Sequence, residues 1–390
     1  MTDGPLTGIR VIEFTHAWAG PMCGRILADF GADVIKVESR KRLDITRITG
    51  PWPKGREHDP DAAYHYLEYN RNKRSINLEL TDSHDLDIAR RLVASADVVV
   101  ENFAPGVLQK FGLDYESICE RNSRVIMLSI SGFGATGPHR SFVAFGQQVE
   151  AESGLMSITG YEGGPPLKVG VSYPDPTAAV SGVLAVMSAL LYRDRTSRGQ
   201  WIDLSMLETT ASMLSGPILE WQLTGHVPVA LGNRSCDSAP HGIYPCRGAD
   251  RWIALEVHGE MEWQRFQAAV GLPWVLDPHY ASQSARLLHS ADLDGEIRKW
   301  TGVQDADELA EKLRMCNVRA PVVATIADLM RDPHLRDRGF WIDFDTVALG
   351  RFRSQGLLAK LHETPGSLRL PPPRLGEHGD EILAELGTND

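Results

Sequence analysis

The 390-residue sequence lacks most short signatures of metal, phosphate and hydrolase chemistry. It has no CxxC pair, no HExxH segment and no Walker-type GxxxxGKS or GxxxxGKT loop, so nothing in it indicates a zinc site or a P-loop nucleotide site. A GxSxG elbow is also missing, which leaves a serine hydrolase without support. What remains is an ordinary globular composition, with 43% hydrophobic and 23% charged residues.

The sequence has fewer basic than acidic residues, and it has few cysteines. The sequence has 40 Lys and Arg against 51 Asp and Glu, a formal net charge of −11 that disfavours general binding to nucleic acid or to an anionic membrane. The odd number and wide spacing of the cysteines are typical of reduced thiols in a cytoplasmic protein. They are Cys23, Cys119, Cys236, Cys246 and Cys316. The opening MTDGPLTGIR shows no signal-peptide pattern, so we expect a cytoplasmic location.

Short β-branched runs alternate with helical segments over the first two hundred residues. Strands are predicted at 9–14, 33–38, 76–80, 97–102, 124–130 and 201–204, with helices at 22–30 and 84–96. Strand, helix and strand at this spacing indicate βαβ units and a parallel sheet. A Gly-, Pro- and Ser-containing stretch at 222–240 indicates a domain boundary. Strands near 242–244, 252–257 and 320–324, with helices between them, then predict a smaller α+β domain.

One stretch, residues 169–195, combines a carboxylate with a long apolar helix. Asp175 is predicted to cap this helix and Pro176 to open it. Nearly every position up to Tyr192 is apolar or small, so the helix is predicted to be buried all round and not to span a membrane. Asp175 has two interpretations: a helix cap only, or a carboxylate that the helix N-terminus keeps ionised, by up to ~2 kcal/mol, for nucleophilic attack.

Three further motifs are ambiguous. Gly132–Gly137 matches GxGxxG after a predicted strand, but Pro138 follows and no helix opens there. A dinucleotide site needs its glycines at a strand-to-helix turn, so a glycine-rich loop that shapes a pocket is the better prediction. The basic clusters Arg40–Arg42 and Arg71–Arg74 are typical of solvated faces, although phosphate binding by either cluster is also open.

Nine stretches, in one order along nearly the whole chain, resemble the family III CoA-transferases. This family includes formyl-CoA transferase, carnitine CoA-transferase and α-methylacyl-CoA racemase. The stretches are LTGIRVIEFTHAWAGPMCGRILADFGADVIKVE, YNRNKRSINLEL, ADVVVENFAPGVLQKFGLDY, GFGATGP, GGPPLKVGVSYPD, RTSRGQWIDLSMLE, NVRAPV, DPHLRDRGFW and LGEHGDEIL. Many ordered matches are far more specific than any one short motif.

The resemblance implies a fold class and an assembly. The fold would be α/β, with a large Rossmann-like CoA-binding domain built from both chain ends, at residues 1–222 and 336–390. Residues 223–335 would form the smaller α+β domain. Members of this family form interlocked dimers, so the resemblance implies an interlocked homodimer with no nucleic-acid and no membrane partner.

The resemblance also implies a set of site residues. Asp175 stands at the family's catalytic aspartate position. In many members a basic residue at the position of Ser39 contacts the adenine end of CoA, and the neighbouring Arg40 is assigned that role here. Trp18 stands where some members have Gln, which implies a different acyl pocket. The residues expected to contact CoA or the acyl group are Ala17, Trp18, Arg40, Leu78, Asn102, Phe103, Lys110 and Phe111. No metal and no cofactor beyond the CoA substrate is implied.

The implied activity moves CoA between an acyl-CoA thioester and a free carboxylic acid through an aspartyl anhydride and an aspartyl-CoA thioester. Gly232 and Gly242 are candidate oxyanion donors. An α-methylacyl-CoA racemase is a competing hypothesis, although the Ala144–Gly146 segment lacks the His that the racemase branch pairs with its aspartate. A non-catalytic partner subunit of a hetero-oligomeric transferase and a nicotinamide oxidoreductase are two further hypotheses.

Overall fold

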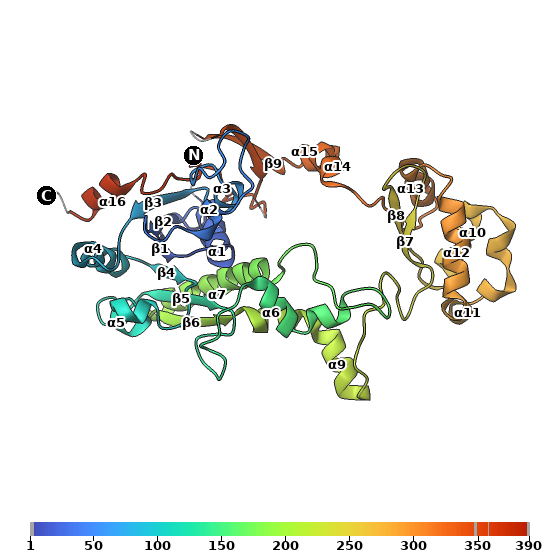
Figure 1. The fold of residues 1–390 in the computed structure, drawn as a ribbon, viewed down its shortest axis with the longest axis horizontal. Helices are drawn as coiled ribbons and strands as arrows, with labels where there is room; N and C mark the ends of the chain where they lie inside the picture. Colours follow the sequence, from blue (N-terminus) through green and yellow to red (C-terminus); the bar gives the residue numbers. More distant parts are fainter. Residues whose placement is uncertain (1–3, 347–348, 358, 388–390) are drawn as a thin grey trace. The chain divides into compact units, whose positions relative to one another are not determined.

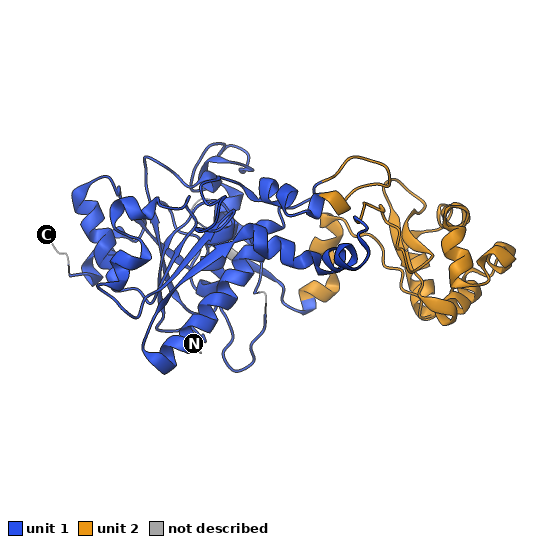
Figure 2. Ribbon diagram, turned by 90° about the horizontal axis from the view of Figure 1, so that it is seen from below, with its two compact units in different colours: residues 1–156, 168–227, 337–390 blue, residues 157–167, 228–336 orange. Residues whose placement is uncertain are grey.

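The computed structural model describes residues 4–346, 349–357 and 359–387. These residues fold into two compact units, coloured separately in Figure 2. Unit 1 takes its described residues from Met1–Met156, Lys168–Val227 and Asp337–Asp390, and unit 2 consists of Ser157–Leu167 and Pro228–Arg336. The larger unit therefore draws on both ends of the chain.

The unit boundaries differ from those of the predicted domains. The predicted domains break after residue 222, whereas the structure places the break after Val227, and it also moves Ser157–Leu167 into unit 2. The Gly232 N–H donates to the Gly160 carbonyl at 3.0 Å, and Arg234 pairs with Glu162 at 3.1 Å. These contacts join the segment to residues that follow it by about seventy positions, a link that local composition does not reveal.

Unit 1 is built on a six-stranded parallel sheet with the order β3-β2-β1-β4-β5-β6 (Figure 1). The strands are β1 (Arg10–Phe14), β2 (Asp33–Glu38), β3 (Lys73–Asn77), β4 (Val98–Glu101), β5 (Ile126–Ser131) and β6 (Gln200–Ser205). The predicted α/β class with a parallel sheet is confirmed. The strand order reverses between β1 and β4, and in such sheets ligands bind beyond the carboxyl ends of the strands at this switch point.

Helices cover both faces of the sheet (Figure 1). One face packs against α1 (Ala19–Asp29), α6 (Gly146–Glu152), α7 (Pro174–Thr196) and α8 (Met206–Ala211). The other packs against α4 (Ser83–Ala94), η1 (Leu108–Phe111), α5 (Tyr115–Cys119) and α16 (Gly379–Glu385). Ile382 of α16 is fully buried, so this last helix packs onto the core of unit 1.

The remaining elements are short. Unit 1 also contains α2 (Ile45–Ile48), α3 (Tyr64–Tyr69), η3 (Ser212–Leu214) and α9 (Ser215–Thr224), and η2 (Leu155–Ile158) spans the boundary after Met156. The C-terminal part contributes the antiparallel pair β9 (Trp341–Thr346) and β10 (Gly350–Gln355). Unit 2 and its exit contain β7 (His241–Pro245), β8 (Trp252–Glu256), α10 (Gly259–Val270), η4 (Pro273–Leu276), η5 (Pro278–Tyr280), α11 (Gln283–Leu288), α12 (Ser290–Thr301), α13 (Ala306–Met315), α14 (Ile326–Arg331) and α15 (Pro333–Asp337).

Two predictions about unit 2 have different outcomes. The strand pair and its covering helices form an α+β core, with α10, α12 and α13 packed on β7 and β8. The predicted strand at 320–324 is wrong, because only isolated bridges join Val322 to Ile253 and Arg319 to Glu256.

Helix α7 is not buried all round in this chain. Val180, Leu184 and Leu191 are exposed on one side, while Ala178, Val186 and the rest of its core-facing residues pack on the sheet. By length and composition it is the one helix of the described residues that could cross a membrane, yet only 33% of its most apolar window is buried. A sequence that is apolar on every side cannot say which side meets the core.

The basic cluster Arg71–Arg74 is buried, contrary to the prediction of a solvated face. Arg71 pairs with Asp29 at 2.7 Å and Lys73 pairs with Glu13 at 2.7 Å. These cations lie in or beside β3, which starts at Lys73 rather than at Ile76, and acidic residues of neighbouring elements neutralise them. Charge that looks like a surface patch in the sequence is here part of the interior.

Candidate active site

Asp175 lies in the first turn of α7. Pro174 is the first helical residue and Tyr173 is the N-cap, so the prediction that Asp175 caps the helix and Pro176 opens it is wrong by two positions. The fixed φ of Pro174 suits the first helical position. Asp175 is therefore inside the helix, with a side chain that is free for other partners.

Three segments converge on the Asp175 carboxylate. The Ser172 hydroxyl donates a hydrogen bond of 2.6 Å to Oδ2, and the backbone N–H of Ala19, at the start of α1, also donates to the carboxylate. The backbone of Gly146, at the start of α6, lies so close that a Cβ there would sit 2.1 Å from Oδ2 of Asp175. The carboxylate is thus held in one place by a hydroxyl, an amide and a glycine.

Burial dominates the electrostatics of Asp175. It raises the pKa of this carboxyl above its ordinary value of 3.8, although the hydrogen bonds from Ser172 and Ala19 act in the opposite direction. Desolvation is the largest contribution and outweighs these hydrogen bonds. A carboxylate with little hydration and a raised pKa is a better nucleophile than an exposed one.

The segment after β1 carries two of the predicted CoA contacts, Ala17 and Trp18. Ala17 has a left-handed backbone with φ of 63°, and its N–H donates to Asp44 Oδ1 at 3.0 Å. The Trp18 ring stacks on Tyr69 with a centroid distance of 5.4 Å. Trp18 directly precedes Ala19, so this ring pair adjoins the amide that contacts Asp175.

Four predicted positions follow the carboxyl ends of β2, β3 and β4. Arg40 is exposed, and its N–H donates to Asn77 Oδ1 at 2.9 Å, beside the buried Leu78. The Asn102 side chain accepts a hydrogen bond from the His16 N–H and donates one to the His16 carbonyl, each at 2.8 Å. The Phe103 ring lies edge-on to the His16 ring, with a centroid distance of 5.1 Å. Because parallel strands end at the same edge, these residues share one edge of the sheet with Trp18.

Lys110 and Phe111 are carried by η1, beyond β4. Lys110 is exposed, whereas Phe111 packs against the core that covers the α4 and α5 face. Arg90 donates to the Phe111 carbonyl at 3.0 Å. No described contact joins this pair to Asp175, so their part in binding CoA rests on the resemblance.

Five residues near the site escaped the sequence analysis. Ser172, three positions before Asp175, is the one that a local signal could have revealed. Ala19, Gly146, Tyr69 and Asp44 are brought in by tertiary packing. Conversely, the suggested oxyanion donor Gly232 already gives its N–H to Gly160 within unit 2.

The glycine-rich loop Gly132–Gly137 lines a cavity, as predicted. No helix opens directly after β5; the next is α6, which starts at Gly146. Asp203 of β6 accepts hydrogen bonds from the Ala135 N–H at 2.7 Å and from the Thr136 hydroxyl at 3.0 Å. The resulting cavity, of about 400 Å³, lies between the loop and β6.

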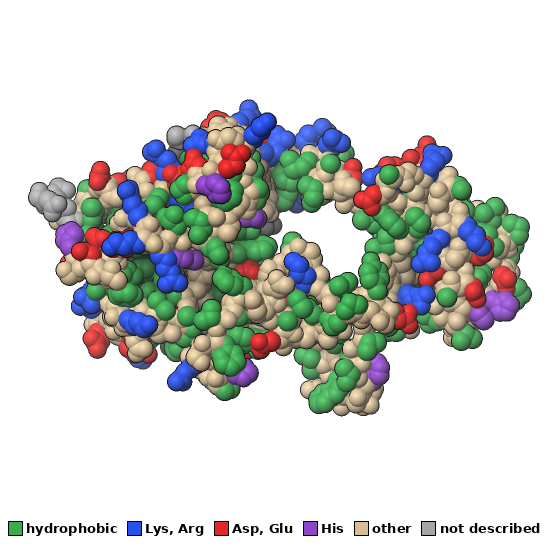
Figure 3. All heavy atoms as spheres, viewed as in Figure 1, with side chains coloured by type: hydrophobic (Ala, Val, Ile, Leu, Met, Phe, Trp, Pro, Cys, Tyr) green, Lys and Arg blue, Asp and Glu red, His purple; other side chains and the backbone are tan. Residues whose placement is uncertain are grey.

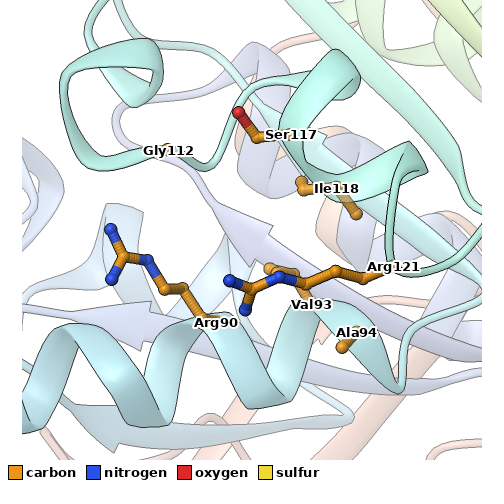
Figure 4. Close-up of a pocket in the computed structure, with 7 residues that line it drawn as sticks. All are labelled: Arg90, Val93, Ala94, Gly112, Ser117, Ile118 and Arg121. Carbon is orange, nitrogen blue, oxygen red and sulfur yellow. The ribbon is translucent and has the colours of Figure 1, made fainter.

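A second, smaller pocket lies between α4 and α5 (Figure 4). In Figure 4 the Arg121 side chain extends towards Arg90, with Ser117 above them. The lining residues are Arg90, Val93, Ala94, Gly112, Ser117, Ile118 and Arg121. None of the residues predicted for the active site is among them.

The chain is similar to known proteins over nearly its whole length. Residues 6–379 match the family described as CoA-transferase family III. A succinyl-CoA–D-citramalate CoA-transferase of Chloroflexus aurantiacus is 36% identical, with 98% of this chain and 94% of that protein covered. A succinate–glutarate CoA-transferase of Agrobacterium fabrum is 35% identical, with 98% and 96% covered. The crystal structure of a CAIB/BAIF family protein from Brucella suis superposes with a TM-score of 0.90 at 33% identity, covering 98% of this chain and 100% of that one.

The protein is therefore an enzyme of the CoA-transferase class, and its chain belongs to CoA-transferase family III. The resemblance found in the sequence is confirmed at the level of the family.

Proposed function

We propose that the enzyme transfers CoA from an acyl-CoA to a free carboxylic acid through a covalent intermediate on Asp175. The observation that carries this proposal is the partly buried Asp175 carboxylate, fixed between Ser172, Ala19 and Gly146. Fixed orientation and low hydration are what a weak oxygen nucleophile needs, and positioning alone can supply effective molarities of ~10⁵–10⁸ M.

The first half of the reaction loads CoA onto the enzyme. A carboxylate oxygen of Asp175 attacks the thioester carbonyl carbon, the C–S bond breaks, and a mixed anhydride and CoA thiolate form. The thiolate then attacks the Asp175 carbonyl carbon of the anhydride. The C–O bond breaks, the donor acid leaves as a carboxylate, and Asp175 carries CoA as a thioester.

The second half repeats these steps with the acceptor. Its carboxylate attacks the aspartyl thioester, giving a new anhydride and CoA thiolate, and the thiolate attacks the acceptor carbonyl to release the new acyl-CoA and free Asp175. Every step exchanges one acyl bond for another, so the scheme requires no metal or redox cofactor.

The proposed substrates are dicarboxylic acids and their CoA thioesters. The two relatives above are named for succinyl-CoA with D-citramalate and for succinate with glutarate. Beside Asp175, Trp18 and Tyr69 stack, and the His65 ring is also stacked with Tyr69, at a centroid distance of 6.3 Å. The indole N–H of Trp18 is buried, and among the described residues it has no hydrogen-bond partner. Ring donors of this kind suit an acyl group with a polar far end.

The proposed assembly is an interlocked homodimer. Val180, Leu184 and Leu191 form an exposed apolar side of α7, and Ile218, Leu219, Trp221 and Leu223 are exposed on α9. Figure 3 shows hydrophobic side chains gathered on the surface over α9. Exposed apolar area of this extent is typical of an interface between subunits.

Replacing Asp175 by Ala tests the covalent scheme. Incubation with succinyl-CoA and a panel of carboxylic acids, with new thioesters read by mass spectrometry, should show transfer by the wild type and none by the variant. Acyl-CoA affinity should stay within a few-fold. Hydroxylamine should trap an adduct on Asp175 of the wild type only. Turnover by the variant would disprove the scheme, and exchange of an α-proton in D₂O would favour a racemase instead.

The dimer is tested by the mass of the purified protein in solution. Light scattering should give twice the 43.0 kDa chain mass. Leu184→Glu, which places a charge on the exposed side of α7, should lower the dimer fraction or the yield of folded protein. A wild-type chain that is monomeric at working concentration would contradict this proposal.

A further inference from the structure

The backbone between β1 and α1 adopts a bend that the side chain of Ala17 disfavours. Ala17 has φ of 63°, in the left-handed region that residues with a Cβ rarely occupy. Trp18 then caps α1 with φ of −120° and ψ of −60°. A strained conformation of this kind persists only where the surroundings impose it. The next residue, Ala19, supplies the N–H that contacts Asp175, so the bend determines the direction in which that N–H points.

Three side chains hold this bend from outside it. Asn102 binds the N–H and the carbonyl of His16, each at 2.8 Å. Lys36 donates to the Thr15 carbonyl at 2.6 Å. Asp44 accepts from the N–H of Ala17 itself, at 3.0 Å. Of the three, Asp44 is the one that contacts the strained residue.

Asp44 is buried, and its hydrogen bonds fall on one of its two oxygens. It is 1% exposed, and its Oδ1 also accepts from the Thr46 N–H at 2.9 Å and the Thr46 hydroxyl at 2.8 Å. Its Oδ2 lies 3.1 Å from Lys36 Nζ. Burial opposes the charge, but Lys36 and the hydrogen bonds lower the pKa of Asp44 to about 2, so it is a carboxylate at neutral pH.

We propose that Asp44 is a positioning residue for the transfer reaction, which holds the Ala17 bend so that the Ala19 amide orients the Asp175 carboxylate. This inference rests on the proposed function of Asp175. Asp44 acts through the backbone and touches neither substrate nor Asp175. It also caps α2, directly after the exposed basic turn Arg40–Arg42, and so joins that turn to the bend.

Asp44→Asn removes the hydrogen bond between Asp44 and the Ala17 N–H with little change in side-chain volume. The amide has one oxygen and one NH₂ group in place of two acceptor oxygens. Lys36 requires the oxygen, since it would otherwise face a donor in the interior. The NH₂ group is then turned towards the Ala17 N–H, and two donors meet. The bend loses the acceptor that stabilises it.

Thr46→Val is the matched control. It removes one hydrogen bond to the same Asp44 oxygen while the contact from Asp44 to Ala17 stays in place. A purely structural role for Asp44 predicts similar losses for both variants. A positioning role predicts a loss of turnover for Asp44→Asn alone.

The test combines kinetics with hydrogen exchange on the full-length protein. In Asp44→Asn, kcat for CoA transfer from succinyl-CoA should fall about 10- to 100-fold while KM for succinyl-CoA changes less than threefold. Amide exchange in a peptide covering residues 15–21 should speed up at least tenfold. Thr46→Val should stay within threefold of the wild type in all three. Ala17→Gly added to Asp44→Asn should restore part of kcat, because glycine accepts a positive φ without strain.

The outcomes separate this inference from the proposed function. A wild type with no transfer and no Asp175 adduct would refute the function, while the exchange data would still report on the bend. A wild type that forms the adduct, with Asp44→Asn within threefold of it in kcat, would overturn the inference. The inference would also be overturned if Asp44→Asn and Thr46→Val lowered kcat and changed KM to the same extent, since equal effects would indicate a general loss of structure.

Discussion

Gly146→Ala should disable the enzyme by displacing the nucleophile. A Cβ built at this position lies 1.8 Å from Ser172 Oγ and 2.1 Å from Asp175 Oδ2, whereas real Cβ contacts stay beyond 3.0 Å. The Asp175 carboxylate or the start of α6 must therefore move by about 1 Å. A misplacement of about 1 Å from the productive geometry can cost about 10²-fold in rate. That factor corresponds to about 2.7 kcal/mol of activation free energy.

The loss should appear in kcat rather than in acyl-CoA binding. Steady-state transfer from succinyl-CoA gives kcat and KM, and we expect kcat to fall about 100-fold with KM within a few-fold, since only the reacting carboxylate is displaced. Gly170→Ala is the control: the same methyl is added a few residues before Asp175, where no atom lies within 4 Å, and it should leave both constants near those of the wild type.

The opposite pattern would refute the geometric argument. If folded Gly146→Ala kept kcat within threefold of the wild type, Asp175 would not be fixed against this glycine. An equal loss in Gly170→Ala would assign the effect to the stability of the segment and not to the carboxylate.

Two further predictions concern charge. Since burial raises the pKa of Asp175 above 3.8 and only its ionised form attacks, kcat/KM should fall as the pH drops through that raised value. Ser172→Ala removes a hydrogen bond that lowers this pKa, so the acidic side of the pH–rate profile should move to higher pH. An unchanged profile would show that Asp175 does not control this pH dependence. Arg71→Met leaves Asp29 buried without its 2.7 Å cationic partner and should lower the free energy of unfolding in urea by about 3–5 kcal/mol. Arg314→Met, in an exposed ion pair, should lower it by less than about 1 kcal/mol. Similar values for both variants would contradict the stabilising role of the buried pair.

Local pattern was sufficient for most of the large unit. The predicted strand at 33–38 coincides with β2, and the strands at 97–102, 124–130 and 201–204 match β4, β5 and β6 within two residues at each end. Such runs are identified by short-range periodicity, which does not depend on what they pack against. The errors fall where packing decides the outcome: the buried cations beside β3, the exposed side of α7 and the segment 157–167, which belongs to unit 2.

The sequence by itself determined the alternation that makes a parallel α/β sheet, the family, and the one carboxylate around which the chemistry is proposed. Only the tertiary structure decided what surrounds that carboxylate. Ser172 is its neighbour in the chain, but Ala19 and Gly146 come from helices far away in sequence. Asp44, which follows β2, binds Ala17, which follows β1. Periodicity and caps are properties of adjacent residues, whereas the environment that raises the pKa of Asp175 exists only after distant segments have packed together.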